Sequence, residues 1–436
     1  MDAELLAHTV IDRLRHYGHQ AWLVGGCVRD LLLGLPPKDF DVATDARPDR
    51  IRELFPDSDL VGAHFGVVLV RSGLTQVEVA TFRSDSDYGD GRRPDSVHFE
   101  TDPSRDAQRR DFTINGLMLD PATGTVLDSV GGRTDLDLRI IRAIGDPGAR
   151  LAEDHLRLLR AVRFAASLNF TIEPATFDAM RRHHALITRV SAERVRDELV
   201  RILTEGGARR GFELLDASGM LADLLPEVAA MKGVEQPPEY HPEGDVWTHT
   251  LLLLEGLNHP TPALALGALL HDVGKPPTFR IAGRIRFDGH VEAGVELARS
   301  ILARLRFSHE LSEQVEALVA NHMRFRDAPN MRPSTLKRFL RQPHFEEHLE
   351  LHRLDCLSSH RHLDNYEFVK SQLAAFSQEE LKPARLLTGS DLIAAGYEPG
   401  PDFSRILAAI EDAQLEGLIS TREDALSLAA SRFPRK

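Results

Sequence analysis

Three carboxylates near the start of the chain have the spacing of a divalent-metal site. Asp39 and Asp41 are separated only by Phe40, and alternate side chains of a β-strand share a face, so both carboxylates would point together while Phe40 and Val42 face the core. Glu78 alternates with two valines on a second β-like run. Hard oxygen ligands suit Mg²⁺, which keeps substrate phosphates in its remaining positions. An isolated Asp-x-Asp is more often a solvated turn, so the prediction depends on Glu78 and on the glycines described next.

Two glycines precede the aspartates. Gly25 and Gly26 follow the apolar run at 22–24. Because glycine has no Cβ, its backbone can approach a phosphate group closely. Glycines and carboxylates together predict a site for a phosphate-bearing substrate and its metal.

The elements that would carry these residues change in type along the chain. Over 1–145, short β-like runs alternate with turns, and 67–70 and 77–82 are the clearest strands. Residues 83–102 are polar and rich in turn formers, which predicts a mobile loop. Beyond 145–148, helical periodicity continues to the C-terminus with breaks at prolines.

Composition excludes several classes of protein. The 436 residues are 42% hydrophobic and 27% charged. No apolar run approaches the roughly 20 residues that span a bilayer, and residues 1–20 have helical spacing instead of the pattern of a signal peptide. The two cysteines, Cys27 and Cys356, exclude a disulfide framework and fit a reducing cytoplasm.

Charge is distributed unevenly. The formal net charge of −13 argues mildly against a nucleic-acid partner. Residues 150–210, however, hold 12 Arg and no Lys against 8 Asp and Glu. This segment is a candidate RNA-binding face, although ordinary surface ion pairs would give the same composition.

Five short motifs, in order, resemble those of a known family. Residues 25–41 (GGCVRDLLLGLPPKDFD) look like the signature of the nucleotidyltransferase superfamily of the DNA polymerase β type. Residues 77–83, 109–116 and 153–157 are similar to the third-carboxylate strand, the nucleotide-sugar motif and the base-selecting motif of class II tRNA nucleotidyltransferases. Residues 191–194 resemble a further motif of their neck.

This resemblance implies a role for each residue of the head. Asp39, Asp41 and Glu78 would be catalytic: the aspartates as Mg²⁺ ligands, and Glu78 by holding or orienting the metal nearer the attacking hydroxyl. Asp111 could accept a hydrogen bond from a 2′-hydroxyl and so select ribose. The nucleotide-binding residues would be Gly25, Gly26, Arg29, Arg110, Asp111, Asn115, Asp154, Arg157, Arg160 and Arg163.

Base selection would depend on Asp154 and Arg157. The two are three apart on a predicted helix and would share a face. The carboxylate could accept from the exocyclic amine of cytosine or adenine, and the guanidinium could donate to ring nitrogens or to the cytosine carbonyl. Uracil and guanine would leave the carboxylate unpaired, at a cost of roughly 1–3 kcal/mol. From spacing alone, a surface ion pair is the alternative.

A second set of histidines and carboxylates lies within 241–360. The pair His271-Asp272 ends an apolar helical run and precedes Val-Gly-Lys, which resembles the HD phosphohydrolase superfamily. The implied ligands are His249, His271, Asp272 and Asp355, and His290 and His322 match positions that bind a second metal in some members.

Mixed imidazole and carboxylate ligands suit Mn, Ni, Co or Fe. The implied activity of this second site is hydrolysis of a phosphoester, such as a 2′,3′-cyclic phosphate, by a metal-activated water. Whether the site is catalytic or vestigial stays open.

The fold expected from both resemblances is an α/β nucleotidyltransferase head of the polymerase β-like type, followed by an all-α neck, body, HD domain and tail. The expected segments are the catalytic head at 1–145, the neck and body at 146–232, the HD-type domain at 233–375 and a tRNA-contacting tail at 376–436.

The implied function is template-independent addition of C and A to the 3′ end of tRNA from CTP and ATP. The RNA 3′-hydroxyl would attack the α-phosphate and pyrophosphate would leave, in a two-metal reaction. The partners would be tRNA, through its acceptor arm and 3′ end, with ATP and CTP. We expect no membrane partner, a cytoplasmic location, and a monomer or weak dimer.

Four alternatives remain at this point. An enzyme that adds only the terminal A would share these motifs. The polar segment 85–94 disfavours a CC-adding enzyme, whose loop is shortened, and does not resemble the corresponding segment of bacterial poly(A) polymerases. An HD phosphohydrolase with an inactive, RNA-binding head is the fourth alternative, which Asp39, Asp41 and Glu78 disfavour.

Overall fold

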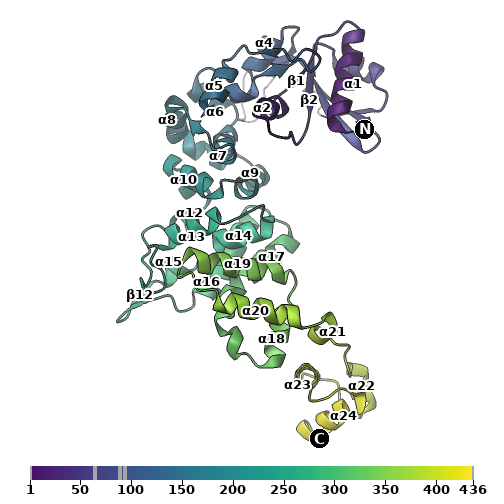
Figure 1. Ribbon diagram of the computed structural model, residues 1–436, viewed down its shortest axis with the longest axis vertical. Helices are drawn as coiled ribbons and strands as arrows, with labels where there is room; N and C mark the ends of the chain where they lie inside the picture. Colours follow the sequence, from purple (N-terminus) through teal and green to yellow (C-terminus); the bar gives the residue numbers. More distant parts are fainter. Residues whose placement is uncertain (1, 62–65, 87–90, 92–95, 435–436) are drawn as a thin grey trace. The chain divides into compact units, whose positions relative to one another are not determined.

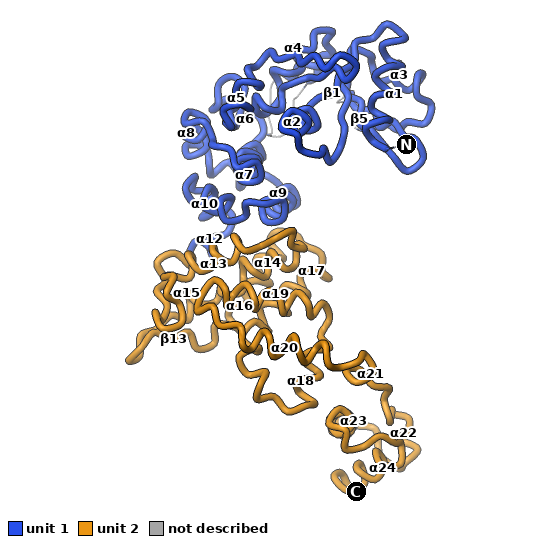
Figure 2. Tube along the Cα trace, viewed as in Figure 1, with its two compact units in different colours: residues 1–229 blue, residues 230–436 orange. Residues whose placement is uncertain are grey.

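Figure 1 shows the fold as a computed structural model, which describes residues 2–61, 66–86, 91 and 96–434. The chain divides into two compact units, residues 1–229 and 230–436 (Figure 2). Each unit has hydrophobic clusters of its own and is described by itself.

A mixed sheet forms the centre of the first part of unit 1. Among the described residues it has seven strands in the order β3-β4-β5-β2-β1-β8-β9. β2 and β5 are parallel, and the other neighbours in the sheet are antiparallel. The strands are β1 (Ala21–Val24), β2 (Asp41–Thr44), β3 (Ser58–Leu60), β4 (Val67–Ser72), β5 (Thr75–Thr81), β8 (Met118–Leu119) and β9 (Val126–Leu127).

Helix α1 (Ala3–His16) packs on this sheet. Asp2 caps the helix by accepting a hydrogen bond from the backbone N–H of Leu5 at 2.8 Å. Its apolar side chains recur at helical spacing and contact β1, β2 and β5. The buried stripe consists of Leu6, Val10, Ile11 and Leu14. The other helices of this part are α2 (Gly26–Leu32), α3 (Pro48–Leu54), α4 (Pro103–Gln108), η2 (Thr113–Asn115) and α5 (Gly132–Leu138).

The prediction of a mobile loop over 83–102 is wrong for much of that segment. β6 (Arg83–Ser86) and β7 (Ser96–Phe99) form an antiparallel hairpin. Polar residues form strands here because their side chains find partners: the Ser84 hydroxyl donates to Glu100 at 2.6 Å. Residues 87–90 and 92–95 of the predicted loop lie outside the described residues.

The rest of unit 1 is helical apart from two short paired strands, β10 and β11. Nearly all of α7 is buried because α9 and α10 pack against it. The elements are β10 (Ile140–Ile141), α6 (Pro147–Glu153), α7 (Arg157–Ser167), β11 (Thr171–Ile172), α8 (Pro174–His183), η3 (His184–Arg189), α9 (Ala192–Thr204), α10 (Ala208–Ser218), α11 (Met220–Leu224) and α12 (Pro226–Ala229).

Unit 2 is almost entirely helical. Helix α14 is buried along its whole length because α13, α17 and α19 surround it. The elements are α13 (Val246–Glu255), α14 (Pro262–Leu270), α15 (Lys275–Thr278), β12 (Arg280–Ile281), β13 (Ile285–Arg286), α16 (His290–Arg304), α17 (His309–Asn321), η4 (His322–Asn330), α18 (Pro333–Leu340), α19 (Phe345–Ser358), α20 (Asp364–Ala375), α21 (Gln378–Leu381), α22 (Gly389–Ala394), α23 (Asp402–Leu415) and α24 (Arg422–Arg432).

The last three helices have a small core of their own, centred on Leu392, Ile406 and Ile410. No helix in the described part of the chain is long and apolar enough to cross a membrane. An α/β head followed by helices confirms the predicted fold class.

Candidate functional site

The proposed catalytic carboxylates lie at one end of β2 and β5. Asp41 is the first residue of β2 and stands opposite Glu78. Phe40 and Val42 are buried, as predicted. Asp39 lies before β2, so the prediction that both aspartates share a strand is wrong. The cause is that β1 ends at Val24, which pairs with Asp41, before the antiparallel pairing can reach Asp39.

The carboxyl group of Asp41 is in an anionic environment. Burial and the nearby carboxylates of Asp39 and Glu78 raise its pKa to about 7, whereas the Arg110 guanidinium opposes this shift. A buried carboxyl beside two other acids is difficult to ionise unless a cation neutralises the repulsion. This donor set of carboxylate oxygens fits Mg²⁺.

Gly25 forms the turn between β1 and α2. Its φ of +76° lies in the left-handed region that favours glycine. A Cβ at this position would lie 3.3 Å from Nη1 of Arg110 and 3.7 Å from Oδ2 of Asp41. The turn therefore brings bare backbone next to both a carboxylate and a guanidinium of the site.

A cavity of about 680 Å³ opens beside the carboxylates, within the size range of ligand pockets. It brings together every nucleotide-binding residue predicted from the sequence, and Glu78 is not part of its lining. The predicted residues that line it are Gly25, Gly26, Arg29, Asp39, Asp41, Arg110, Asp111, Asn115, Asp154, Arg157, Arg160 and Arg163.

Sequence reasoning missed Asp106, which fixes two arginines of the cavity. Its carboxylate is fully buried in α4 and accepts from Arg109 Nε at 2.8 Å and from Arg110 Nη2 at 3.1 Å. Although burial alone would raise the pKa of Asp106, the two guanidinium groups lower it. The i, i+3 and i, i+4 spacing of these residues on a helix was the available signal.

Asp111 is held as an anion by its neighbours. Burial alone would raise its pKa, but Arg160, Asn115 and the Phe112 backbone hold it at about 2. Arg160 donates to Asp111 Oδ2 at 2.6 and 2.8 Å. Asn115 donates to Asp111 at 3.1 Å and accepts from Arg29 at 2.9 Å, which links these side chains into one network.

Three guanidinium groups surround the ring of Phe164 at one side of the cavity. Those of Arg29, Arg160 and Arg163 lie 5.1, 5.3 and 4.1 Å from its centroid. Arg163 is buried and donates to Glu198 at 2.6 Å. The packing of cations on an aromatic ring keeps positive charge where a polyphosphate could bind.

Asp154 and Arg157 both line the cavity, but they do not share a helix. Asp154 is the residue that ends α6, with extended backbone angles, and α7 begins at Arg157. Arg157 donates to Glu153 at 2.6 Å, whereas Asp154 accepts from Arg194 at 3.1 Å. The predicted shared helix face is therefore wrong, because a break between two helices separates the pair.

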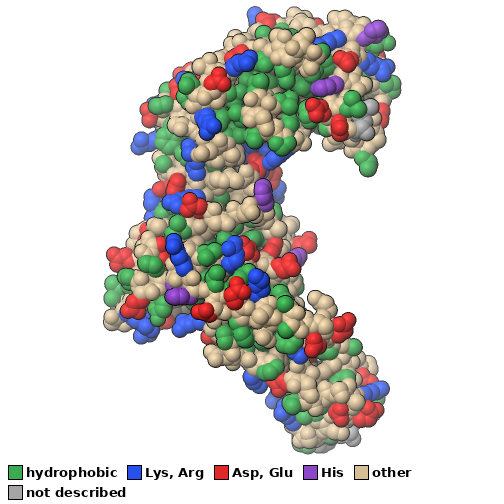
Figure 3. All heavy atoms as spheres, viewed as in Figure 1, with side chains coloured by type: hydrophobic (Ala, Val, Ile, Leu, Met, Phe, Trp, Pro, Cys, Tyr) green, Lys and Arg blue, Asp and Glu red, His purple; other side chains and the backbone are tan. Residues whose placement is uncertain are grey.

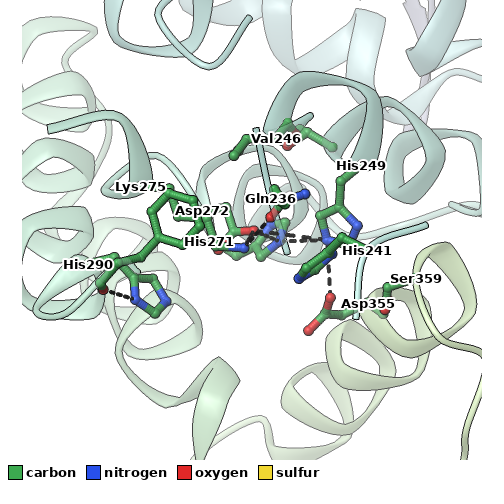
Figure 4. A network of polar contacts seen from close by, with 12 residues as sticks. Gln236, His241, Val246, His249, His271, Asp272, Lys275, His290, Asp355 and Ser359 are labelled. Carbon is green, nitrogen blue, oxygen red and sulfur yellow. Dashed lines mark hydrogen bonds and ion pairs between the residues drawn. The ribbon is translucent and has the colours of Figure 1, made fainter. Parts of the chain in front are cut away.

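In unit 2, the predicted HD ligands converge from three parts of the chain (Figure 4). His249 comes from α13, His271 ends α14 and Asp355 comes from α19. Nε2 of His249 lies 3.3 Å from Nε2 of His271 and 3.1 Å from Oδ1 of Asp355. Asp272 Oδ2 lies 3.2 Å from His271 Nε2. The ligand atoms of His249, His271 and Asp355 lie within 4.8 Å of one another and could bind one metal ion, and Asp272 lies beside them.

A second potential ligand group adjoins the first. It consists of Asp272, His290 and His322. Nε2 of both histidines is buried and makes no hydrogen bond within the described residues. Burial lowers the pKa of His322 to about 4, which keeps the imidazole in the neutral form that binds metals.

All four histidines turn Nε2 toward the centre because Nδ1 is engaged elsewhere. Nδ1 of His271, His290 and His322 contacts a backbone carbonyl at 2.9, 2.9 and 2.7 Å. A carbonyl only accepts, so each Nδ1 carries the proton and Nε2 has a free lone pair. For His249 the partner is the carboxylate of Glu243, at 2.8 Å. Such outer contacts are typical of metal-binding histidines, so the residues fit a metal.

Sequence reasoning missed this outer layer. Glu243 also contacts Nδ1 of His241 at 2.8 Å. Lys275 is buried between Asp272 Oδ2 and Gln236 Oε1, at 2.6 Å from each. Its ammonium group lies 5.4 Å from the centroid of the Phe287 ring.

Two backbone segments touch beside this centre. A Cβ at Gly274 would lie 2.0 Å from the His290 carbonyl oxygen and 2.5 Å from the Gly294 nitrogen. The segment that carries His271 and Asp272 thus lies directly against the first turn of α16, where His290 is located.

Three family models match the chain. The poly A polymerase head domain matches residues 21–142, the probable RNA and SrmB-binding site of polymerase A matches 169–232, and the HD domain matches 245–356.

Solved structures with the same fold include the Bacillus stearothermophilus CCA-adding enzyme in complex with CTP. It is 26% identical, with a TM-score of 0.76, over 98% of this chain and 96% of that one. The Thermotoga maritima CCA-adding enzyme complexed with tRNA_CCA has a TM-score of 0.59 at 19% identity, over 99% of this chain and 96% of that one, and supports the fold alone.

Curated relatives match over different lengths. The Levilactobacillus brevis CCA-adding enzyme is 44% identical over 215 residues, which span 49% of this chain and about half, 54%, of that relative. The Streptococcus mutans CCA-adding enzyme is 32% identical over 434 residues, which cover 96% of this chain and 94% of that protein. With a match of this identity and extent, and with nucleotidyltransferase and HD regions in the same chain, the protein belongs to the family of CCA-adding enzymes.

Proposed function

We propose that the chain adds C and A residues to the 3′ end of tRNA, using CTP and ATP as substrates. The single observation that carries this proposal is the cavity in which Asp39 and Asp41, the Gly25 turn and the arginines around Phe164 come together. The cavity would lie between the proposed head, 1–145, and the proposed neck and body, 146–232. The HD-type domain at 233–375 and the tail at 376–436 remain proposed divisions of the rest.

In this proposal, different side chains of the cavity bind the triphosphate and the ribose of the nucleotide. Arg29, Arg110 and Arg163 would bind the triphosphate, and the backbone at Gly25 would approach it without steric hindrance. Asp111, ionised because its pKa is held at about 2, would accept a hydrogen bond from the ribose 2′-hydroxyl. The 3′-hydroxyl of the RNA would attack the α-phosphorus, and its proton and pyrophosphate would leave.

Asp39 and Asp41 would hold the magnesium, and Glu78 would orient it through its position opposite Asp41. A divalent cation there would supply charge stabilisation for the attacking and leaving oxygens. The pKa of Asp41, raised by burial and by repulsion from Asp39 and Glu78, supports this assignment.

Base choice would depend on Asp154 and Arg157 despite their separate helices. Arg157 is held by Glu153 and by the backbone carbonyls of Arg150 and Arg109. Asp154 is bound to Arg194 through one guanidinium nitrogen. We propose that Asp154 receives the exocyclic amine of cytosine or adenine while Arg194 keeps the carboxylate in place.

The test is an addition assay with purified protein, Mg²⁺ and single labelled nucleotides. Transcripts of tRNA that end before CCA, and transcripts that end in CC, would be offered separately. Incorporation of C and then A into the first, and of A into the second, is expected. Incorporation of A into the CC transcript alone would identify the alternative, an enzyme that adds only the terminal A. Incorporation into neither would contradict both.

A second function is proposed for unit 2 because His290 and His322 have unsatisfied, buried Nε2 atoms beside Asp272. We propose a metal-dependent phosphodiesterase that opens small phosphodiesters such as 2′,3′-cyclic phosphates. Water would add to phosphorus, one P–O ester bond would break, and the ester oxygen would leave with a proton. A transition metal (Mn, Ni, Co or Fe) held by His249, His271, Asp272 and Asp355 would supply Lewis-acid polarisation.

Both functions would be performed in the cytoplasm by a monomer or weak dimer.

A further inference from the structure

The hairpin formed by β12 and β13 carries positive charge that the described residues do not neutralise. Arg280 stands directly opposite Arg286 across the two strands. Like charges in such a pair repel one another, and Asp288 pairs with Arg280 alone. Arg284 and Arg286 are exposed and have no ion pair within the described residues. Figure 3 shows Lys and Arg side chains at the edge of unit 2 where Figure 1 draws β12.

The hairpin also presents apolar surface. Phe279, at its base, is 38% exposed, and Ile281 is 73% exposed. Single-stranded nucleic acids are bound by basic side chains that follow the backbone, together with aromatic rings on which bases stack. Two unpaired arginines next to an exposed phenylalanine have this combination.

The base of the hairpin is attached to the HD centre. The Phe279 and Phe287 rings lie 5.9 Å apart, and Lys275, which contacts Asp272, lies against Phe287. The carbonyl of Phe287 accepts from Nδ1 of His290 at 2.9 Å. A ligand on the hairpin would therefore be held next to two residues of the centre.

We propose that the β12–β13 hairpin is a binding surface for single-stranded RNA, whose terminal phosphoester it presents to the HD centre. Arg284 and Arg286 bind backbone phosphates, and Phe279 stacks on a base. The presentation of a scissile phosphoester rests on the phosphodiesterase activity proposed above. RNA binding by the hairpin does not depend on that activity.

The test compares Arg284→Ala/Arg286→Ala with Arg326→Ala/Arg332→Ala in the full-length protein. Arg326 and Arg332 are also exposed arginines of unit 2 without an ion pair within the described residues, and they lie outside the proposed tRNA-contacting tail, so they control for lost charge. The probe is a fluorescein-labelled RNA 12-mer with a 3′-phosphate, which the head cannot extend because it has no free 3′-hydroxyl. Its dissociation constant is measured by anisotropy as a function of salt.

Loss of two phosphate contacts should make the slope of log K against log salt shallower by about 1.4, at roughly 0.7 per contact for a single strand. The hairpin double variant should bind the RNA about tenfold more weakly at low salt, whereas the control should bind as the wild type does. Phe279→Leu, which keeps an apolar side chain, should weaken binding without changing the slope. Equal affinities and slopes for both double variants would overturn the proposal.

A parallel assay of 2′,3′-cyclic AMP hydrolysis by the metal-loaded wild type distinguishes RNA binding by the hairpin from phosphodiesterase activity of the HD centre. A changed slope without hydrolysis would support the RNA surface and contradict the phosphodiesterase. Hydrolysis with an unchanged slope would contradict the RNA surface alone.

Discussion

At the scale of single residues, Asp39 and Asp41 are the most direct test of the head. Replacing either by Ala should lower nucleotide addition by more than about 100-fold, because loss of a residue that only supports a metal ligand already costs 10–100-fold. Nucleotide addition would be measured on tRNA transcripts. Circular dichroism of each variant would be the control for folding. Near-normal addition by either variant would remove that aspartate from the catalytic set.

Asp41 should also make the metal-free protein sensitive to pH. Its carboxyl has a pKa of 3.8 when exposed and about 7 in the folded protein, so between these values the folded state holds the proton more tightly. Folding stability contributed by this group is therefore present below about pH 4 and lost as the pH rises to 7. In EDTA, the melting temperature of wild type relative to Asp41→Asn should fall over this range.

Added Mg²⁺ should reverse that loss in the wild type more than in Asp41→Asn, because the cation favours the ionised carboxylate. If the difference in melting temperature between the two proteins did not change with pH, the pKa of Asp41 would not be raised in the folded state.

The base-selecting residues allow a third prediction. Asp154→Ala or Arg157→Ala should relax the preference for C and A over U and G by about tenfold, because an unpaired buried polar group costs roughly 1–3 kcal/mol. Competition among the four nucleotides measures this preference, and the KM for CTP reports triphosphate binding. Arg150→Ala is a useful control, because that arginine also binds Glu153 but does not line the cavity. An unchanged preference in both test variants would exclude this pair from base choice.

At the scale of elements, residues 83–94, which include β6, are predicted to be needed for the terminal A. This segment follows the strand of Glu78, and Gly91 accepts a hydrogen bond from the backbone N–H of His155, next to Asp154. Deleting 86–91 should stop products at CC and should leave the affinity for tRNA within about twofold, since loops of this kind complete a site after substrate binding.

The control for this deletion is the exposed turn at Gly73 and Leu74 between β4 and β5, where a glycine insertion should have no effect on products. Normal A addition by the deletion variant would show that the segment only connects two strands.

The sequence predicted those strands that are stabilised by a regular apolar pattern, and it did not predict those that depend on tertiary contacts of polar side chains. β2 and β5 were readable because Val42, Val77 and Val79 alternate with polar residues. β6 and β7 were missed because their polar side chains are satisfied by partners such as Glu100, which no periodicity reveals. The break between the helices of Asp154 and Arg157 was missed for a related reason. Arg157 is held by hydrogen bonds to two backbone carbonyls, and these bonds form only in the tertiary structure.

At the scale of the whole molecule, the two proposed sites belong to different units and use different ligands. Changing His271 and Asp272 together to Ala should remove bound transition metal and any phosphodiesterase activity, while Mg²⁺-dependent nucleotide addition stays within about twofold. Metal analysis and both assays on the same preparation test this. His309→Ala/Glu313→Ala, an exposed pair in unit 2, is the matched control.

Wild-type protein that retains no transition metal after reconstitution would contradict the proposed metal and mark the HD centre as vestigial. The six ligand residues predicted for this centre lie in two adjacent groups that could hold metal ions, and their role as ligands stays a prediction. The sequence did not predict Glu243 or Lys275, whose contribution is visible only when their neighbours are in place.

The close contact at Gly274 limits which substitutions this position can accept during evolution. Any side chain at residue 274 would overlap the His290 carbonyl, so substitution by even a small residue such as alanine or serine is excluded unless the backbone moves. Even alanine would have to push α16 away, which would move His290 away from Asp272 in the second ligand group. In a library that randomises residue 274 under selection for metal retention, the survivors should all carry glycine. At Gly283, which has open space around it but a φ of +71°, asparagine and aspartate should persist beside glycine.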